Sequence, residues 1–257
     1  HELSRMGDEV LFSRKGHVAV FTLNRPKARN AVNAALSARM EALLETFEKD
    51  DELWVGIVAS STPGKAFSAG ADLKEVGKGV PINGPKGGFG GFVHYPRTKP
   101  LIAAVDGPAL AGGLEIVLGC DLVVASARSR FGVPEVKRSL VPAAGGVFRL
   151  PRRLPRHVAL EMVLTGDPIS AARAEQLGFV NALVADPSKV CGSPPRPLCH
   201  VRPLEAVHCA VSLVCLLVGM PSMAAWKLHV HRCASQDGGQ LTRGLAGLSD
   251  RYLMRRM

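Results

Sequence analysis

Two glutamates in the middle of the chain stand among apolar residues. Glu115 lies between a leucine and an isoleucine shortly after two glycines, and Glu135 follows a proline in the stretch FGVPEV. A carboxylate in such surroundings must be paired, lie at a helix terminus or serve a cavity, because burial of an unpartnered charge is costly. Two glutamates in one cavity could hold a water molecule and exchange protons, since burial raises carboxylate pKa values toward the working range of an acid and a base. For Glu115 alone, complementation of a helix N-terminus is the alternative.

Two segments repeat one design, in which a buried strand ends in a turn of small residues that opens into a helix. They are IVASSTPGKAFSAGADLKEV at 57–76 and IAAVDGPALAGGLEIVL at 102–118. Such a turn exposes backbone N–H groups at a helix N-terminus, where the dipole favours negative charge. Two of these turns facing each other would form an oxyanion hole. Close packing of a strand on a helix also needs small residues, so a purely structural reading stays open.

The elements around these turns alternate between strand and helix. A β-rich stretch at 17–24 precedes a turn at Pro26, and apolar residues then recur at helical spacing over 31–50. Further short strands are predicted at 55–61, 101–107 and 121–126, with a helix over 113–120. This alternation predicts an α/β domain.

The composition changes near Asp186. Residues 1–186 carry a formal net charge of +4, whereas 187–257 carry +6 together with five of the six cysteines. The second part is rich in Pro, Cys, His and Arg and has weak periodicity, so we place a domain boundary there. The cysteines form no CxxC pair, which disfavours a metal site and favours reduced intracellular thiols.

Two further patterns concern flexibility and location. The segment 79–92 holds six glycines and two prolines, which predicts a mobile surface or lid loop. The chain has no run of about 18 uninterrupted apolar residues, so no membrane span is expected. The start HELSRM lacks the apolar core of a secretory signal. We therefore expect a cytoplasmic protein, with a mitochondrial or other organelle matrix as the alternative.

Five segments together resemble the enoyl-CoA hydratase/isomerase, or crotonase, family. They are NRPKARNAV, KAFSAGADLKEV, PLIAAVDGPALAGGLEIVLGCDLVVAS, FGVPEVKRSLVPAAGG and MVLTGDPISAARAEQLGFVNALV, in consistent order from about residue 8 to 185. Within the family, GGVFRLPRRLPRHVALEMVLTGDPISA and GPKGGFGGF are most similar to carnitinyl-CoA dehydratases, also called crotonobetainyl-CoA hydratases. The resemblance implies an α/β crotonase-like spiral of repeated ββα units with a C-terminal helical region. It assigns 1–186 to the spiral core with the acyl-CoA site, and 187–257 to the position of the trimerisation and lid helices.

The resemblance also implies a mechanism. The family pattern places the oxyanion-hole donors on the backbone N–H groups of Ala71 and Gly112, and the catalytic pair on Glu115 and Glu135. These groups would hydrate a 2-enoyl-CoA, or in reverse dehydrate a 3-hydroxyacyl-CoA, with Glu115 activating water toward C3 and Glu135 protonating C2. Hydratases of the family use both glutamates, whereas its double-bond isomerases typically keep one. The substrate-binding residues implied are Lys27, Arg29, Ser68, Ala69, Gly70, Asp72 and Leu73.

Several implied properties accompany this site. No cofactor and no metal are expected, because coenzyme A is part of the acyl-CoA thioester substrate. The family assembles as homotrimers or dimers of trimers. Three positions depart from the usual pattern: Ala111 replaces a glycine, Asp106 an asparagine and Ser139 a glycine. Residues 187–257 depart further, because they lack the family's acidic closing stretch.

Other functions remain as alternatives. An enoyl-CoA isomerase or another acyl-CoA lyase would use the same loops, and a chain whose last part does not assemble would be an impaired scaffold. The family also includes hydratase-like proteins that bind RNA, and RLPRRLPRH at 149–157 holds five basic or potentially basic side chains. Phosphate attraction needs only such a patch, but base recognition requires stacking aromatics, and the patch contains none. Nucleic-acid binding therefore ranks below hydration.

Overall fold

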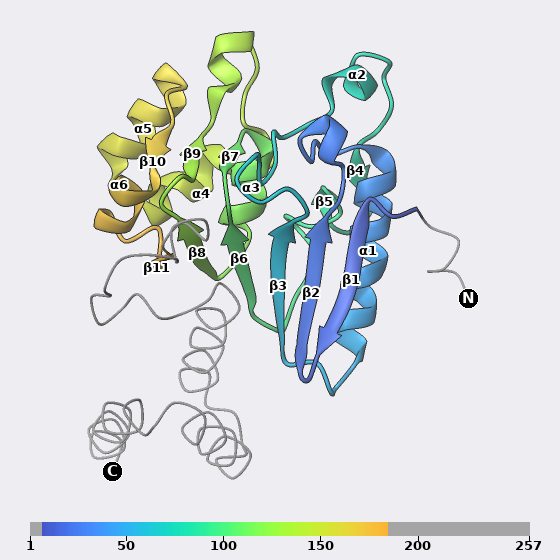
Figure 1. Ribbon diagram of the computed structural model, residues 1–257. Coiled ribbons are helices and arrows are strands. Elements are labelled where there is room, and N and C mark those ends of the chain that lie inside the picture. The colour runs from blue at the N-terminus through green and yellow to red at the C-terminus, as the bar shows by residue number, and fades with distance from the viewer. Residues whose placement is uncertain (1–6, 185–257) are drawn as a thin grey trace, which may run out of the picture. The chain divides into compact units, whose positions relative to one another are not determined.

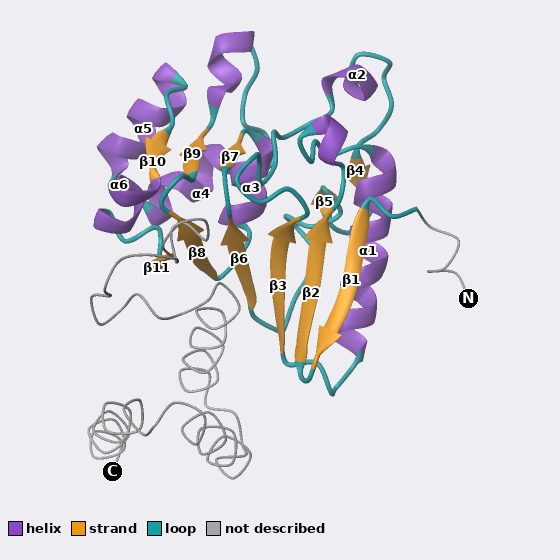
Figure 2. Ribbon diagram, in the orientation of Figure 1, coloured by secondary structure: helices purple, strands orange, loops and turns teal. Residues whose placement is uncertain are grey.

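A six-stranded sheet forms the centre of the protein (Figures 1 and 2). The computed structural model describes residues 7–184. In sheet order the strands are β1 (Val10–Lys15), β2 (Val18–Leu23), β3 (Val55–Ser60), β6 (Leu101–Val105), β8 (Leu122–Ser126) and β11 (Ala182–Val184). The first two strands form an antiparallel hairpin, and every later neighbour pairs in parallel. The near-continuous apolar runs of β3, β6 and β8 are typical of parallel strands that are covered on both faces.

A second, smaller sheet consists of β7 (Pro108–Leu110), β9 (Arg130–Gly132) and β10 (Ile169–Ser170). The chain leaves β6 for β7 and then α3 (Gly112–Leu118), and leaves β8 for β9 and then the 3-10 helix η3 (Pro134–Arg138). Each turn of the chain thus adds one strand to each sheet before a helix. Isolated bridges at Val32–Ala71 and Ser68–Ala109 continue the second layer into earlier turns. The predicted spiral of strand-strand-helix units is confirmed.

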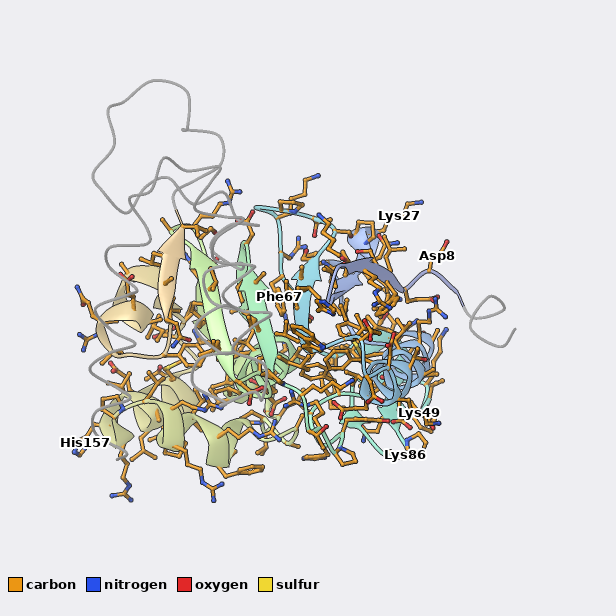
Figure 3. All side chains as sticks on the ribbon, turned by 90° about the horizontal axis from the view of Figure 1, so that it is seen from below. Asp8, Lys27, Lys49, Phe67, Lys86 and His157 are labelled. Atoms are coloured by element: carbon orange, nitrogen blue, oxygen red, sulfur yellow. The ribbon has the colours of Figure 1, made fainter. Side chains whose placement is uncertain are left out.

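The remaining helices flank the large sheet at its two ends. The 16-residue helix α1 (Ala34–Lys49) packs against β1 and β2, while α4 (Gly146–Arg153), α5 (Arg156–Thr165) and α6 (Ala171–Gln176) gather near β8 and β10 (Figure 1). The short elements η2 (Pro26–Ala28) and α2 (Leu73–Val76) lie in the loops that follow β2 and β3. Figure 3 shows Phe67 in the interior and Lys27, Lys86 and His157 at the periphery. The predicted strands and helices before 126 are confirmed to within about three residues, but β1 was not predicted and β7 was predicted as a turn.

Two further predictions concern the domain boundary near Asp186 and the absence of a membrane span. The boundary near Asp186 and the whole of 187–257 lie outside the described residues. None of the helices within 7–184 has the length and apolar character needed to cross a membrane.

The glycine-rich segment 79–92 is held against the protein along its second half, so the prediction of a mobile surface loop is wrong there. It forms a small hairpin of β4 (Asn83–Gly84) and β5 (Gly88–Phe89), and residues 89–93 are buried. The carboxylate of Glu41 on α1, which is 8% exposed, accepts the Gly87 N–H at 2.8 Å and the Lys86 N–H at 3.2 and 3.3 Å. A buried carboxylate that receives backbone N–H groups fixes a segment whose own composition favours motion.

Replacement of Glu41 tests this anchor. In Glu41→Gln the new amide turns an N–H donor toward backbone donors, which leaves a buried N–H without an acceptor, so unfolding should require about 1–3 kcal/mol less free energy. Urea denaturation of the purified protein measures the change. The control is Glu45→Gln on the same helix, where an exposed carboxylate pairs with Lys49 and Lys86 and should contribute little, because solvent screens the pair. Equal effects of the two variants would contradict the anchor.

Candidate active site

The two turns of small residues lie in direct contact. Gly70 has φ +94°, and a Cβ placed on it would lie 2.8 Å from the Ala111 Cβ and 2.9 Å from the Gly112 nitrogen. Real Cβ atoms do not approach backbone so closely, and φ in this range is strained for any other residue. The structure therefore requires glycine at 70, and the reason is the approach of the second turn.

The backbone N–H groups of Ala71 and Gly112 have no hydrogen-bond acceptor within residues 7–184. Around Ala71, the Gly70 carbonyl accepts the Val32 N–H at 2.7 Å and the Asp72 N–H donates to the Val32 carbonyl at 2.8 Å. Since backbone groups alternate in direction along an extended chain, the Ala71 N–H points away from Val32. Gly112 is the first residue of α3, where no intrahelical acceptor exists. Two unbonded donors on touching turns are the elements of an oxyanion hole.

Glu115 lies on the same helix as the second donor. It stands three residues after Gly112, so both are on one face of α3. Its side chain is 3% exposed, and one carboxylate oxygen accepts the Gly146 N–H at 2.8 Å. Burial raises the pKa of Glu115 above its ordinary value, against the opposing effects of the Gly146 and Ala144 N–H groups and the Arg149 charge. The carboxylate is thus fixed in place and desolvated, as a catalytic base requires.

Glu135 begins η3 directly after Pro134 and is 8% exposed. Its Oε2 atom is buried and has no hydrogen-bond partner among the residues that the structure describes. Burial raises the pKa of Glu135 to about 7, and the nearby charge of Glu115 adds to the effect. The charge of Glu115 thus opposes the ionisation of Glu135.

A phenylalanine from the glycine-rich segment closes one side of the second donor. A Cβ placed on Gly112 would lie 2.3 Å from the Phe89 ring, so the ring packs directly on the Gly112 Cα. Phe89 is 7% exposed, and Gly90 next to it faces Ile116 on α3. The segment that Glu41 anchors thus supplies a fixed wall beside the oxyanion donors. Sequence reasoning missed this role because the glycines indicated motion.

The residues predicted to bind the substrate fall into two groups. Lys27, Arg29, Ala69 and Leu73 are exposed, and the Ala69 N–H donates to the Arg29 carbonyl at 3.0 Å, which joins the two predicted segments. Asp72 is engaged within the protein, because it pairs with Arg25 at 3.0 Å and caps α2. Burial alone would raise the pKa of Asp72, but its bonds to Arg25 and backbone N–H groups lower it overall.

Ser68 differs from its prediction. It is fully buried, and its hydroxyl donates to the Asn30 carbonyl at 2.8 Å rather than facing a substrate path. The structure therefore gives this side chain an internal role between the two turns.

The basic stretch at 149–157 is only partly available to a partner. Arg149 donates to the Val93 carbonyl, and Arg153 donates to the carbonyls of Cys120 and Asp121. Arg152 is exposed and lies over the Phe148 ring. Two of the four arginines therefore hold backbone carbonyls, Arg153 those just after α3 and Arg149 that of Val93, which is a structural use that the pattern alone did not indicate.

The departures from the family pattern have local explanations. Asp106 receives two bonds from the Arg128 guanidinium, at 2.7 and 2.8 Å, so its charge is paired. Ala111 has φ +52° and Ser139 has φ +54°, which are values that glycine adopts more easily. Both positions thus keep a glycine-like backbone without the glycine.

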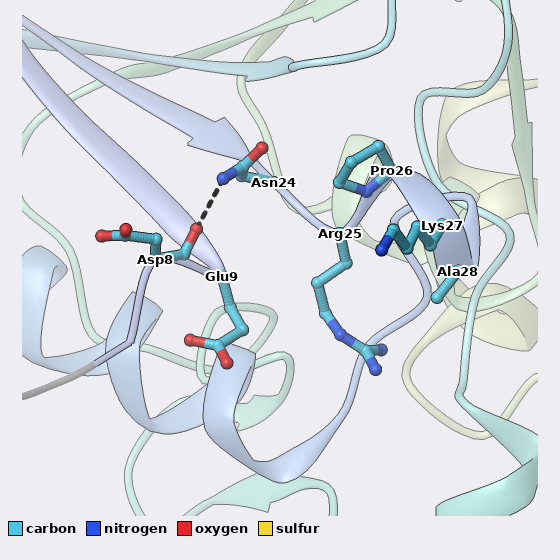
Figure 4. Close-up of a pocket in the computed structure, with 7 residues that line it drawn as sticks. All are labelled: Asp8, Glu9, Asn24, Arg25, Pro26, Lys27 and Ala28. Atoms are coloured by element: carbon cyan, nitrogen blue, oxygen red, sulfur yellow. Dashed lines mark hydrogen bonds between the residues drawn. The ribbon is translucent and has the colours of Figure 1, made fainter.

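A pocket of about 390 Å³ has neither Glu115 nor Glu135 in its lining (Figure 4). It is lined by Asp8, Glu9, Asn24, Arg25, Pro26, Lys27 and Ala28, and the Asn24 amide donates to the Asp8 carbonyl at 2.9 Å. Its charges are mixed, so we assign it no ligand.

No cluster of three or more metal-ligating side chains occurs in 7–184. Burial raises the pKa of the Cys120 thiol to about 12.

The raised pKa of Glu135 has a consequence for stability. A carboxyl whose pKa is higher in the folded protein than in the unfolded chain stabilises the fold below about pH 4.5, and this contribution is lost as pH rises through about 7. Glu135→Gln keeps a neutral group at every pH, so it should raise the melting temperature more at pH 8.5 than at pH 4.5. Thermal unfolding at both pH values measures this difference. The exposed Glu161 on α5 provides the control Glu161→Gln, and an equal gain at both pH values would argue against a buried Glu135.

Comparison with known proteins agrees with this geometry. The model of the enoyl-CoA hydratase/isomerase family matches residues 13–193. A probable enoyl-CoA hydratase of Rhizobium meliloti is 40% identical over 180 residues, which are 69% of each chain. A carnitinyl-CoA dehydratase of Citrobacter koseri is 40% identical over 184 residues, 70% of this chain and 69% of that protein.

The fold has similar solved structures. A carnitinyl-CoA dehydratase from Mycobacterium avium superposes with a TM-score of 0.73 at 38% identity, over 97% of this chain and 90% of that chain. The family match exceeds half of the chain, and its residues include both turns and both glutamates. The chain therefore belongs to the enoyl-CoA hydratase/isomerase family.

Proposed function

We propose that this protein adds water reversibly across the C2–C3 double bond of a 2-enoyl-CoA thioester. The observation that carries the proposal is the pair of buried, electrostatically coupled glutamates, Glu115 and Glu135, together with the unbonded N–H groups of Ala71 and Gly112. Members of the family with a single glutamate are typically isomerases. The pair therefore favours hydration over isomerisation.

The residues divide the chemistry among themselves. The N–H groups of Ala71 and Gly112 donate to the thioester oxygen and stabilise the enolate that forms during addition; loss of one such donor typically costs about 3 kcal/mol. Glu115 takes a proton from water as its oxygen bonds to C3, and Glu135 gives a proton to C2. The proton that leaves water is retained on Glu115 while Glu135 loses its own, so the pair holds one proton before and after the complete addition, and exchange of that proton from Glu115 to Glu135 restores the starting state.

The coenzyme A portion is proposed to follow the two exposed segments. Lys27 and Arg29 would meet phosphates, and Ala69, Gly70, Asp72 and Leu73 would lie along the adenine and pantetheine path. The bond between the Ala69 N–H and the Arg29 carbonyl supports a continuous path. The reaction requires no further cofactor, because coenzyme A enters with the substrate. A carnitinyl or crotonobetainyl head group is proposed from the names of the relatives.

Assembly and compartment are proposals as well. We expect a homotrimer or a dimer of trimers in the cytoplasm. Exposed apolar side chains on η3, α4, α5 and the intervening loop support an interface between copies; they are Val136, Leu140, Val141, Val147, Phe148, Leu160 and Leu164.

Removal of either catalytic carboxylate should reduce hydration strongly. Glu115→Gln and Glu135→Gln should each lower kcat by about 10²–10⁴-fold, the usual contribution of a positioned acid or base. The loss of enone absorbance of crotonyl-CoA and crotonobetainyl-CoA reports the rate, and Glu161→Gln serves as the control for an exposed carboxylate. Full activity in both variants would exclude the proposed reaction, and conversion to a shifted double bond would favour an isomerase.

Closure of the gap between the turns should also abolish activity. In Gly70→Ala the added methyl would contact the Ala111 Cβ and the Gly112 nitrogen, and the backbone would be strained at φ +94°. We expect a fall in kcat of more than about 100-fold. Gly16→Ala changes a glycine with φ +57° and no neighbouring atoms within 4 Å, so it controls for strain alone. Comparable activity in both variants would show that the contact between the turns is not needed.

The dependence on pH should be the same in both directions. The pair must hold one proton, so kcat/KM for hydration should fall as pH rises above about 7, where Glu135 ionises. Because the overall reaction takes up no proton, kcat/KM for dehydration should fall with the same midpoint. Rates with the enoyl-CoA and the hydroxyacyl-CoA between pH 5 and 9 measure both profiles. A kcat/KM that stays constant from pH 6 to pH 9 would contradict a catalytic proton on Glu135.

A further inference from the structure

Ser68 lies where the two turns of the oxyanion hole meet, and it has no exposed surface. It stands two residues before Gly70 and three before the proposed donor Ala71. A buried hydroxyl at this place must satisfy both its donor and its acceptor, since an unpaired polar group in the interior is costly.

The hydroxyl of Ser68 makes two bonds on the side of the first turn. It donates to the carbonyl of Asn30 at 2.8 Å and accepts the N–H of Gly70 at 3.2 Å. The second bond fixes the Ala69–Gly70 peptide, which is adjacent to the Gly70–Ala71 peptide that carries the proposed donor and whose carbonyl accepts the Val32 N–H at 2.7 Å. The direction of the Ala71 N–H therefore depends on where the Ser68 oxygen is held.

The backbone of Ser68 is bonded to the second turn. Its carbonyl accepts the Leu110 N–H at 3.0 Å, and its own N–H donates to the Pro108 carbonyl at 3.3 Å. A Cβ placed on Gly113 would lie 2.3 Å from the backbone carbonyl oxygen of Ser68. One residue thus contacts both turns, and through them the peptides that carry the two proposed donors.

Asn30 provides a fixed partner for this hydroxyl. It is fully buried with φ +55°, and its side-chain amide donates to Ser60, Thr62 and the Ala66 carbonyl. Its side-chain oxygen accepts the Arg25 N–H at 2.9 Å. With both ends of the amide bonded, the Asn30 carbonyl has little freedom to move with the substrate.

We propose that Ser68 is a positioning residue that sets the orientation of the Ala71 N–H relative to the Gly112 N–H. The inference rests on the proposed hydratase function and adds a residue that does not touch the substrate. Donors that stabilise developing charge must be held in place before the reaction, and a displacement of about 1 Å can cost about 100-fold in rate.

A matched pair of variants separates positioning from stability. Ser68→Ala removes the hydroxyl that bridges Asn30 and Gly70. Ser129→Ala removes another buried hydroxyl that donates to the Val105 carbonyl at 2.9 Å and accepts the Gly107 N–H at 3.2 Å; it also contacts the Ser126 hydroxyl at 3.0 Å and bonds to neither Gly70 nor residues 110–113. The two variants should lose similar stability in urea.

Two measurements on the folded proteins should then differ between the variants. Ser68→Ala should lower kcat for crotonyl-CoA by about 10–100-fold with KM changed less than about threefold, because the lost interaction acts in the transition state. It should also reduce the shift to longer wavelength of a bound dimethylaminocinnamoyl-CoA, whose absorbance follows the polarisation of its carbonyl. Ser129→Ala should retain the wild-type kcat and shift. Ser68→Cys, with a weak donor and acceptor, should recover part of both.

Each failure has a distinct meaning. If the wild type hydrates crotonyl-CoA but Ser68→Ala keeps its kcat and its absorbance shift, the positioning role is wrong. Equal kcat losses in Ser68→Ala and Ser129→Ala would likewise assign Ser68 a structural role only. If the wild type hydrates neither crotonyl-CoA nor crotonobetainyl-CoA, the proposed function itself fails.

Discussion

The contact between Gly70 and the start of α3 is the constraint on which the site depends. The first turn approaches so closely that a single methyl group on Gly70 would overlap the second turn. This approach is possible only because β3 and β6 are neighbours in the large sheet and both strands end on the same side. The spiral therefore brings two loops that are about 40 residues apart in sequence into van der Waals contact. Side chains that would be reactive elsewhere are excluded here by space.

Desolvation distinguishes this site from a simple pair of loops. Both glutamates are nearly inaccessible to solvent, and the pKa of each is raised for that reason. Glu115 retains a backbone N–H partner in Gly146, while the Oε2 of Glu135 has none within the described part of the chain. Such a difference in environment assigns different proton affinities to two chemically identical groups. An unpaired buried oxygen costs stability, and the fold retains it at the position where we propose that a proton is transferred.

The sequence alone allowed the prediction of much of the fold and of the pairing of the two turns. Short apolar runs located β2, β3, β6 and β8, because parallel strands that are buried on both faces are apolar along most of their length. The three-residue strand β7 was read as a turn, since Pro108–Leu110 is too short to show alternation and is a strand only through its pairing with β9. The glutamates were identified because charged residues rarely occur among apolar neighbours.

Other features depended on tertiary contacts that no local pattern records. Ser68 was predicted to face the substrate, because sequence indicates that a loop is polar but not which atom meets which partner. The segment 79–92 was predicted to move, since its glycines permit motion and the acceptor that prevents it, Glu41, lies on a helix about 40 residues earlier. Both cases have one cause, which is a hydrogen bond between residues distant in sequence.

The anchored segment has a thermodynamic consequence for ligand selection. Phe89 is packed on Gly112 through contacts of the protein itself, so this wall does not have to be ordered when an acyl group enters. If only the buried residues 89–93 had to be ordered on association, the loss of binding free energy would be roughly 5–10 kcal/mol, at about 1–2 kcal/mol for each residue fixed. That entropy is instead lost during folding, and discrimination between acyl groups on this side becomes a matter of steric fit.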